Sequence, residues 1–414
     1  MAERLPADLT EAEASALLLA VPDLGPAAHG ALLRAHGSAL ATLESAARPG
    51  AAARLASLMT EDGSRLALDP GVARELVTSL AILGDRLTLL RSAAVRIVTF
   101  DDPAYPARLR AVEQPPPLLF AQGAIEALHA EHVVAIVGTR RPTEHGRVLA
   151  TRIAALVGAA GATVVSGLAL GIDGASHAAA VHDAAPTAAV LGSGHLRLVP
   201  QAHRLLAERI LATGGVVVSE FWPDQPPDTW TFPRRNRVIS GVADATVVVE
   251  AGERSGALIT AHHALEQGRE LFVVPGRIGD PASAGCLQWL RTYPGAARIV
   301  AGVHELIDDL GLVEPGPPGP PSPRRDRGRR SGAPASLGAV LLELGSTARG
   351  VAVALASGHG TLDDLVAATG LEPATVLGAI TLLELRGLVL STFGRYRAAG
   401  SLAAAPDAGA VARA

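Results

Sequence analysis

Hydrophobic and polar positions between residues 95 and 310 follow one repeated pattern, in which short apolar runs alternate with longer amphipathic stretches. Most of the apolar runs are continuous, which is typical of strands buried on both faces of a parallel sheet. The longer stretches have helical spacing. The runs predict strands at 95–100, 117–120, 133–138, 162–167, 187–194, 215–220, 245–251 and 270–276. This alternation indicates an α/β fold with a Rossmann-like, doubly wound, mainly parallel sheet.

The segments on either side of this region have different patterns. The N-terminal segment is rich in Ala and Leu at helical spacing, and the last compact segment is also helical in pattern. The stretch before that last segment is rich in Pro, Gly and Arg, and it holds too few apolar residues to fold. We therefore expect a helical domain at 1–90, a Rossmann-like domain at 91–312, a disordered linker at 313–336, a C-terminal domain at 337–400 and a disordered tail at 401–414.

A Pro/Gly turn at residues 21–29 separates two helical runs of the first domain. This outline resembles a helix-hairpin-helix or SAM-like unit, which presents the backbone N–H groups of a helix start to phosphate. An ordinary αα-hairpin in a small bundle stays open as the alternative, because no basic residue lies in the turn itself.

The amino-acid composition limits the kinds of function that this chain can have. The formal net charge is −4, so any nucleic-acid contact must come from local basic loops. All 36 basic residues are Arg, a bias that a GC-rich genome explains, so only the positions of individual arginines are informative. The single cysteine, Cys286, excludes an internal disulfide and a Cys-based zinc site. The start of the chain is a poor signal peptide and no long apolar run is present, so we expect a cytoplasmic protein without a membrane partner.

Ligands of doubly wound sheets bind at the carboxyl ends of the strands, so the residues that follow the strands are the candidates for function. Arg140 and Arg141 stand near a predicted helix start, where the helix dipole already favours an anion. Asp173 is a candidate either for a ligand contact or for capping its helix. The candidates from the loops after 133–138, 162–167 and 245–251 are Gly138, Thr139, Arg140, Arg141, Ser166, Gly167, Ser255 and Gly256.

A predicted loop at 221–237 concentrates aromatic and basic residues in a chain that is only 3% aromatic. Arginines hold phosphates and rings stack on unpaired bases, so this combination suits single-stranded nucleic acid. A structural loop whose arginines pair with Glu220 and Glu250 is the alternative. The candidates in this loop are Phe232, Arg234, Arg235, Asn236 and Arg237, with Trp222 and Trp230 upstream.

Several catalytic motifs are missing from the sequence: a P-loop, GxGxxG after the first strand, GxSxG and HExxH. The acidic residues at strand ends have no clear nucleophile beside them. The sequence therefore favours binding over catalysis, with no cofactor and no metal.

Four motifs occur in order: GTRRPTEHG, SGLALGIDGASHAAA, FPRRNRVISG and SGALITAHHALEQGRELFVVPG. Together they resemble the DNA-processing protein A family (DprA, also called Smf). The resemblance implies a Rossmann-like domain that forms a homodimer, binds single-stranded DNA and loads the RecA recombinase in natural transformation or homologous recombination. A general recombination or repair role stays equally open.

The resemblance also implies roles for particular residues. It places Arg140 on phosphate, Ser166 and Gly167 in the pocket floor, and Phe232, Arg235, Asn236 and Arg237 in an FPxRNR motif. Two positions depart from the family pattern. Some relatives carry a Lys shortly before the Phe of this motif, but here Phe232 follows Thr229, Trp230 and Thr231, so DNA affinity would depend on Arg234 instead. At the second position, Leu287 stands where the family often has Asn.

The C-terminal segment reads as a helix, a turn and a second helix from 361 to 385, followed by a short hairpin to 397. This is a winged-helix-like pattern, which many members of the family carry. The second helix has few basic residues, so we favour a protein contact or a weak DNA role over the reading of duplex DNA.

Two other functions stay open for the Rossmann-like domain. Related domains hydrolyse nucleoside monophosphates with a PGGxGTxxE loop, but the corresponding segment 251–257 lacks the paired glycines and has no Glu in the expected place. A nucleotide-sensing protein of the same LOG-related kind is the third candidate.

Overall fold

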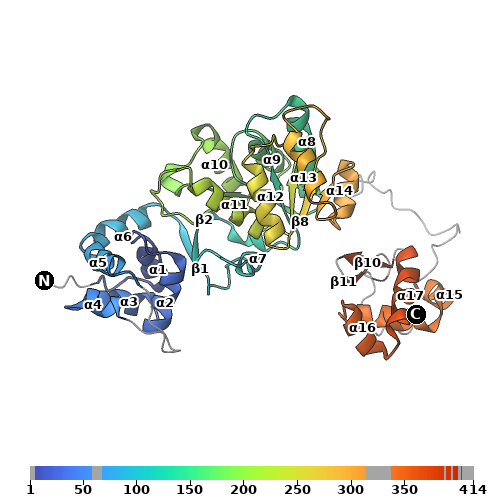
Figure 1. Ribbon diagram of the computed structural model, residues 1–414, viewed down its shortest axis with the longest axis horizontal. Helices are drawn as coiled ribbons and strands as arrows, with labels where there is room; N and C mark the ends of the chain where they lie inside the picture. The colour runs from blue at the N-terminus through green and yellow to red at the C-terminus, as the bar shows by residue number, and fades with distance from the viewer. Residues whose placement is uncertain are drawn as a thin grey trace, which may run out of the picture. The chain divides into compact units, whose positions relative to one another are not determined.

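The computed structural model describes residues 5–57, 68–313, 337–386, 388–392, 395–399 and 402. The chain forms two compact units, Met1–Gly319 and Pro320–Ala414 (Figure 1). The predicted linker lies outside the described residues except for Val313, and so does the predicted tail except for Leu402. The finer domain boundaries at 90 and 312 stay predictions of the sequence.

Helices make up the described part of the N-terminal region, as the pattern predicts. They are α1 (Glu11–Leu19), α2 (Pro26–His36), α3 (Ala39–Ala46), α4 (Ala51–Ala56), α5 (Pro70–Ser79), the 3-10 turn η1 (Leu80–Ile82) and α6 (Leu83–Ser92). A capping box between Thr10 and Glu13 fixes the start of α1. The shared core of these helices, which includes Leu18, Leu32 and Leu43, continues onto Phe120 of the sheet.

A mixed sheet forms the centre of the first unit (Figure 1). Its strands are β1 (Arg96–Thr99), β2 (Leu118–Gly123), β3 (Val133–Val137), β4 (Thr163–Ser166), β5 (Thr187–Val190), β6 (Val216–Ser219), β7 (Ala245–Val248), β8 (Glu270–Val273) and β9 (Ala297–Ile299). Their order is β1-β2-β6-β5-β4-β3-β7-β8-β9. The β2 strand pairs antiparallel with both β1 and β6, and the strands from β6 to β9 are parallel.

Helices cover both faces of this sheet, which confirms the doubly wound fold. They are α7 (Ala107–Arg110), η2 (Ile125–His129), α8 (Glu144–Ala159), α9 (Ile172–His182), η3 (His195–Arg197), η4 (Gln201–His203), α10 (Arg204–Ala212), α11 (Thr231–Gly241), α12 (Ala257–Glu266), α13 (Ala284–Thr292) and α14 (Val303–Asp309). One core joins the sheet to α11, α12 and α13, and another joins it to α8, α9 and α14. Both faces are therefore buried, which explains the continuous apolar runs.

Two expectations about local structure were wrong. The sequence pattern missed β9, because this strand is short and carries the charged Arg298 between two apolar residues. The segment that holds FPRRNR is not a loop: the chain is helical from Thr231 onwards, in α11. Pro233 is tolerated there because the first turn of a helix leaves its N–H groups without intrahelical partners.

The second unit contains the predicted helix, turn, helix and hairpin. Its elements are α15 (Leu337–Ala356), α16 (Leu362–Thr369), α17 (Pro373–Leu385), β10 (Val389–Thr392) and β11 (Arg395–Ala398). The two strands pair antiparallel, and α15 bends at Gly345, where φ is 91°. Among the described helices none is by itself long and apolar enough to cross a membrane. By length and composition alone, α16 and α17 up to Glu384, which are bent by 107° relative to each other, would be long and apolar enough as a pair.

The pH dependence of folding tests the core of the N-terminal helices. His29 is buried, its Nε2 lies 3.0 Å from Ser15 Oγ, and burial lowers its pKa from 6.5 to about 4. The unfolded chain then binds a proton that the folded chain excludes, so stability falls as the pH drops from 6.5 toward 4. We expect His29 to account for a loss of about 2 kcal/mol between about pH 7 and about pH 5, measured by urea unfolding.

The variant His29→Gln should lose this part of the pH dependence. His182→Gln is the matched control, because the side chain of His182 is 84% exposed. An unchanged pH dependence in His29→Gln would contradict the prediction.

Candidate nucleic-acid interface

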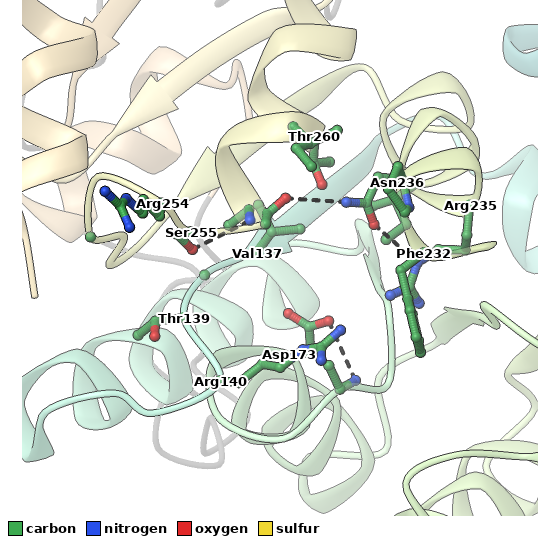
Figure 2. A pocket seen from close by; sticks show the side chains of 18 of the residues that line it. Val137, Thr139, Arg140, Asp173, Phe232, Arg235, Asn236, Arg254, Ser255 and Thr260 are labelled. Carbon is green, nitrogen blue, oxygen red and sulfur yellow. Dashed lines mark hydrogen bonds between the residues drawn. The ribbon is translucent and has the colours of Figure 1, made fainter. Parts of the chain in front are cut away.

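The strand order changes direction between β3 and β7, which are neighbours although they are far apart in the sequence. The chain passes from β3 to β4 on one side and from β7 to β8 on the other. Such a switch point leaves a crevice at the carboxyl ends of the strands. A cavity of about 610 Å³ lies there, lined by the loops after β3 and β7 and by the start of α11 (Figure 2).

The loop after β3 forms one wall of this cavity. Thr139 fixes the loop with its backbone: its N–H donates to Glu250 O at 2.7 Å, and its carbonyl accepts from Ile172 N at 3.2 Å. Gly171 must approach this loop closely, because a Cβ there would lie 2.3 Å from Thr139 O. The backbone is thus held on two sides, while the side chains of Arg140 and Arg141 are exposed.

The first turn of α11 forms the opposite wall. Phe232 is half-buried and rests against the loop after β5, where a Cβ on Gly192 would lie 2.7 Å from its ring. The guanidinium carbon of Arg140 lies 4.9 Å from the centre of the Phe232 ring, a cation–π arrangement. An aromatic face and a flat cation therefore meet at the mouth of the cavity.

Arg235 is buried beneath this wall, at 4% exposure. Its Nη1 donates to the carbonyls of Gly167, at 2.6 Å, and Val190. Burial lowers the pKa of Arg235 to about 10, so the side chain is still charged at neutral pH. Arg235 therefore ties α11 to the ends of β4 and β5, and the close approach leaves no room for a Cβ at Gly167, which would lie 2.5 Å from Nη1.

The sequence left open whether Asp173 contacts a ligand or caps its helix. The N-cap of α9 is Gly171, and Asp173 instead accepts hydrogen bonds from the N–H groups of Gly167, at 3.1 Å, and Ala169. Burial raises its pKa, and the charge of Arg235 opposes that shift. Asp173 thus orders the loop after β4, although it also lines the cavity.

The loop after β7 supplies the third wall. Ser255 and Gly256 line the cavity, and Gly256 O accepts a hydrogen bond from Asn236 Nδ2 at 3.1 Å, which joins this loop to α11. Arg254 also lines the cavity and is exposed. Figure 2 shows Arg254 and Ser255 on one side and Phe232 and Arg235 on the other. Arg254 is not among the candidates expected from the sequence, although its place directly before Ser255 in a strand-end loop is a usable signal.

The charges around the cavity are unevenly paired. In the part of the chain that the structure describes, no ion pair within 4.0 Å involves the guanidinium groups of Arg140, Arg141 or Arg254. The helices α11 and α12 also begin at this wall, so the positive ends of their dipoles add to the field. The site is thus arranged for an anion that reaches it from solvent.

Four of the predicted site residues lie elsewhere. Ser166 is fully buried and donates to Ile136 O at 2.6 Å, and Gly167 lies under Arg235. Arg234 and Arg237 both pair with the buried carboxylate of Glu220. The alternative of a structural segment whose arginines pair with strand-end acids is therefore confirmed for these two arginines and Glu220. The FPRRNR cluster is divided because successive residues of a helix point in different directions.

Stability measurements can separate the buried, structural role of Arg235 from the exposed position of Arg140. Arg235→Ala leaves two buried carbonyls without their donor and Asp173 without its nearby cation. We expect this variant to lose about 3 kcal/mol in the free energy of urea unfolding. Arg140→Ala removes an exposed side chain and should cost about 1 kcal/mol or less. Similar losses for both variants would contradict this division of roles.

Comparison with known proteins agrees with this geometry. The family model described as DNA recombination-mediator protein A matches residues 96–311, more than half of the 414 residues, and the DprA winged helix domain matches residues 341–395. A relative from Mycobacterium tuberculosis is 36% identical over 348 residues, which cover 81% of this chain and 84% of that protein. The DNA processing protein DprA of Bacillus subtilis is 35% identical over 224 residues, 54% of this chain and 74% of the relative.

Solved structures give the same result. The DNA processing protein A of Streptococcus pneumoniae superposes with a TM-score of 0.57 at 29% identity, covering 73% of this chain and 98% of that one. The resemblance that the four sequence motifs carry is therefore confirmed, and with it the winged helix and the general role of the family, the mediation of DNA recombination. The chain belongs to the DNA recombination-mediator protein A (DprA/Smf) family.

Proposed function

We propose that the cavity between β3 and β7 holds the backbone of single-stranded DNA. Arg140, Arg141 and Arg254 would contact phosphates, and an unpaired base would stack on the face that Phe232 and Arg140 share. The observation that carries this proposal is the group of three exposed arginines that have no acidic partner among the described residues, around a cavity that also has an aromatic wall. Arginine and an aromatic ring together suit phosphate and unpaired base.

The remaining predicted residues support this site in different ways. Gly138 and Thr139 shape the loop, and Ser255, Gly256 and Asn236 offer polar groups along the wall. Ser166, Gly167 and Arg235 act from beneath, because their side chains or backbone lie under the cavity. Arg237 acts through Glu220, outside this cavity.

The cavity is proposed as a binding site without catalysis. Asp173 is committed to two backbone N–H groups, and Glu253 is exposed on the rim. The hydroxyl of Ser166 lies beside Asp173, but it is fully buried and donates to Ile136 O, so it does not face the cavity. Among the described residues neither carboxylate therefore has an exposed, hydrogen-bonded nucleophile, which nucleophilic catalysis would require. Incubation of the protein with AMP tests the competing hydrolase function, since a hydrolase would release adenine.

Partners follow from the family and stay proposals. RecA loading, a homodimer through the Rossmann-like domain, a place in natural transformation and a cytoplasmic location are all consistent with a recombination mediator. For the C-terminal domain we propose a protein contact or a weak DNA role, because α17 itself contains no Arg, Lys or His. Duplex-reading helices normally carry such residues.

Salt dependence of binding tests the proposed phosphate contacts. Each of Arg140→Ala and Arg254→Ala should weaken binding to single-stranded oligonucleotides and should reduce the slope of log K against log salt by about 0.7. Fluorescence anisotropy over a salt series measures both quantities. Arg209→Ala is the control, since Arg209 is exposed on α10 and does not line the cavity. An unchanged slope in both cavity variants would exclude the phosphate contacts.

A further inference from the structure

A second cavity, of about 640 Å³, lies at the carboxyl end of β6. Its wall combines the turn between α1 and α2, Arg86 of α6, the residues just before β2, the loop after β6, and two residues from the start of α11. All of these belong to the first compact unit. Since β6 runs parallel to β5, β4 and β3, this cavity opens at the same edge of the sheet as the first one.

One short segment contributes to both cavities. Thr229 and Phe232 line the first cavity, whereas Trp230 and Arg234 line the second. Three strand spacings separate β3 from β6, a distance of about 14 Å. A strand of DNA that leaves the first cavity over the start of α11 therefore reaches the second cavity within a few nucleotides.

Two polar atoms of residues that line the second cavity are shielded from solvent and have no hydrogen-bond partner among the residues that the structure describes. The side chain of Glu220 is 2% exposed; its Oε2 accepts from Arg234 and Arg237, but its Oε1 has no hydrogen-bond partner. The indole Nε1 of Trp222, a residue that is 9% exposed, has none either. Unpaired buried polar groups are costly, so an acceptor and a donor left unpaired in one cavity wall point to a ligand that satisfies both.

Aromatic rings and charges define the chemistry of that ligand. Trp230 is 48% exposed and packs edge-on against Phe221 with ring centres 5.6 Å apart, which leaves a face open for stacking. The charged residues of the wall are Arg86 and Arg234 against Asp23, Glu220 and Asp224. This excess of carboxylates disfavours phosphate and suits a neutral ring that carries N–H donors.

We propose that the second cavity is a nucleobase subsite for the same single strand that the first cavity holds. The base stacks on Trp230. Once small movements of the Glu220 and Trp222 side chains expose their unpaired atoms, the base donates an amino or imino N–H to Glu220 Oε1 and accepts from Trp222 Nε1 through a ring nitrogen or carbonyl. Every base offers such a donor and acceptor on its pairing edge, and carboxylates are known acceptors for base amino groups. The subsite rests on the proposed function, because the first cavity supplies the phosphate contacts.

Tryptophan fluorescence gives a direct test, because the chain has three Trp residues and two of them line this cavity. In Trp289→Phe the remaining signal comes from Trp222 and Trp230. We expect an oligothymidine of about 16 nucleotides to quench this signal, and a thymidine dinucleotide, which is too short to span the about 14 Å between the two cavities, to quench it little. Quenching should fall when the long oligonucleotide is replaced by an abasic one of equal length.

Binding by the variants separates this subsite from the first cavity. Trp230→Ala should weaken binding of the long oligonucleotide about tenfold with no change in salt slope, since a base contact releases no counterions. Trp222→Phe keeps a ring and removes the N–H, and should weaken the same binding about fivefold. Neither variant should alter binding of the short oligonucleotide, whereas Arg140→Ala should weaken both and reduce the slope.

The outcomes distinguish the two proposals. Binding of both oligonucleotides without Trp quenching, or equal effects of Trp230→Ala on short and long ones, would overturn the subsite and leave the first cavity intact. Quenching by the long oligonucleotide with an unchanged salt slope in Arg140→Ala would overturn the phosphate site and keep the base contact. A Trp230→Ala variant with a reduced salt slope would show a phosphate, not a base, at the second cavity and would also overturn the subsite.

Discussion

The arrangement of the binding edge depends on the hydrogen bonds that the buried side chain of Arg235 donates. Its guanidinium lies almost wholly inside the protein and donates to the carbonyls of Gly167 and Val190, at the ends of β4 and β5. Its helix, α11, carries Phe232 in the first turn, and Trp230 is the N-cap residue directly before that turn. Arginine suits this position because it keeps its charge when buried and offers several donors in a plane. The helix that presents aromatic rings to solvent is thereby fixed to the sheet below it.

The arginines near the binding edge are of two kinds. Arg235 donates to backbone carbonyls and Arg237 pairs with Glu220, so both side chains stabilise the fold of the protein itself. Arg140, on the loop after β3, pairs with no acid within the described part of the chain and stays exposed beside Phe232. A family motif that is rich in arginine thus contains structural cations, and the cations available to a ligand come largely from the loops that face it.

The direction change of the sheet explains why these loops meet. Because β3 and β7 are adjacent and their crossovers run to opposite sides, the loops after them diverge and leave a crevice that no side chain of the sheet fills. Glycines at 138 and 171 allow the loop after β3 to lie close against the start of α9. The N-terminal helices extend this edge, since their core continues onto β2 and Trp222.

The sequence by itself determined the order and class of the elements, because buried parallel strands leave continuous apolar runs, and it determined the family through four ordered motifs. It also identified Arg140 and Phe232, which follow directly from strand-end position and composition. It did not determine that Arg234 and Arg237 turn away toward Glu220, that Arg235 is buried, or that Arg254 joins the cavity. Those outcomes depend on the helical start of α11 and on strand order, and both arise from contacts between residues far apart in the chain.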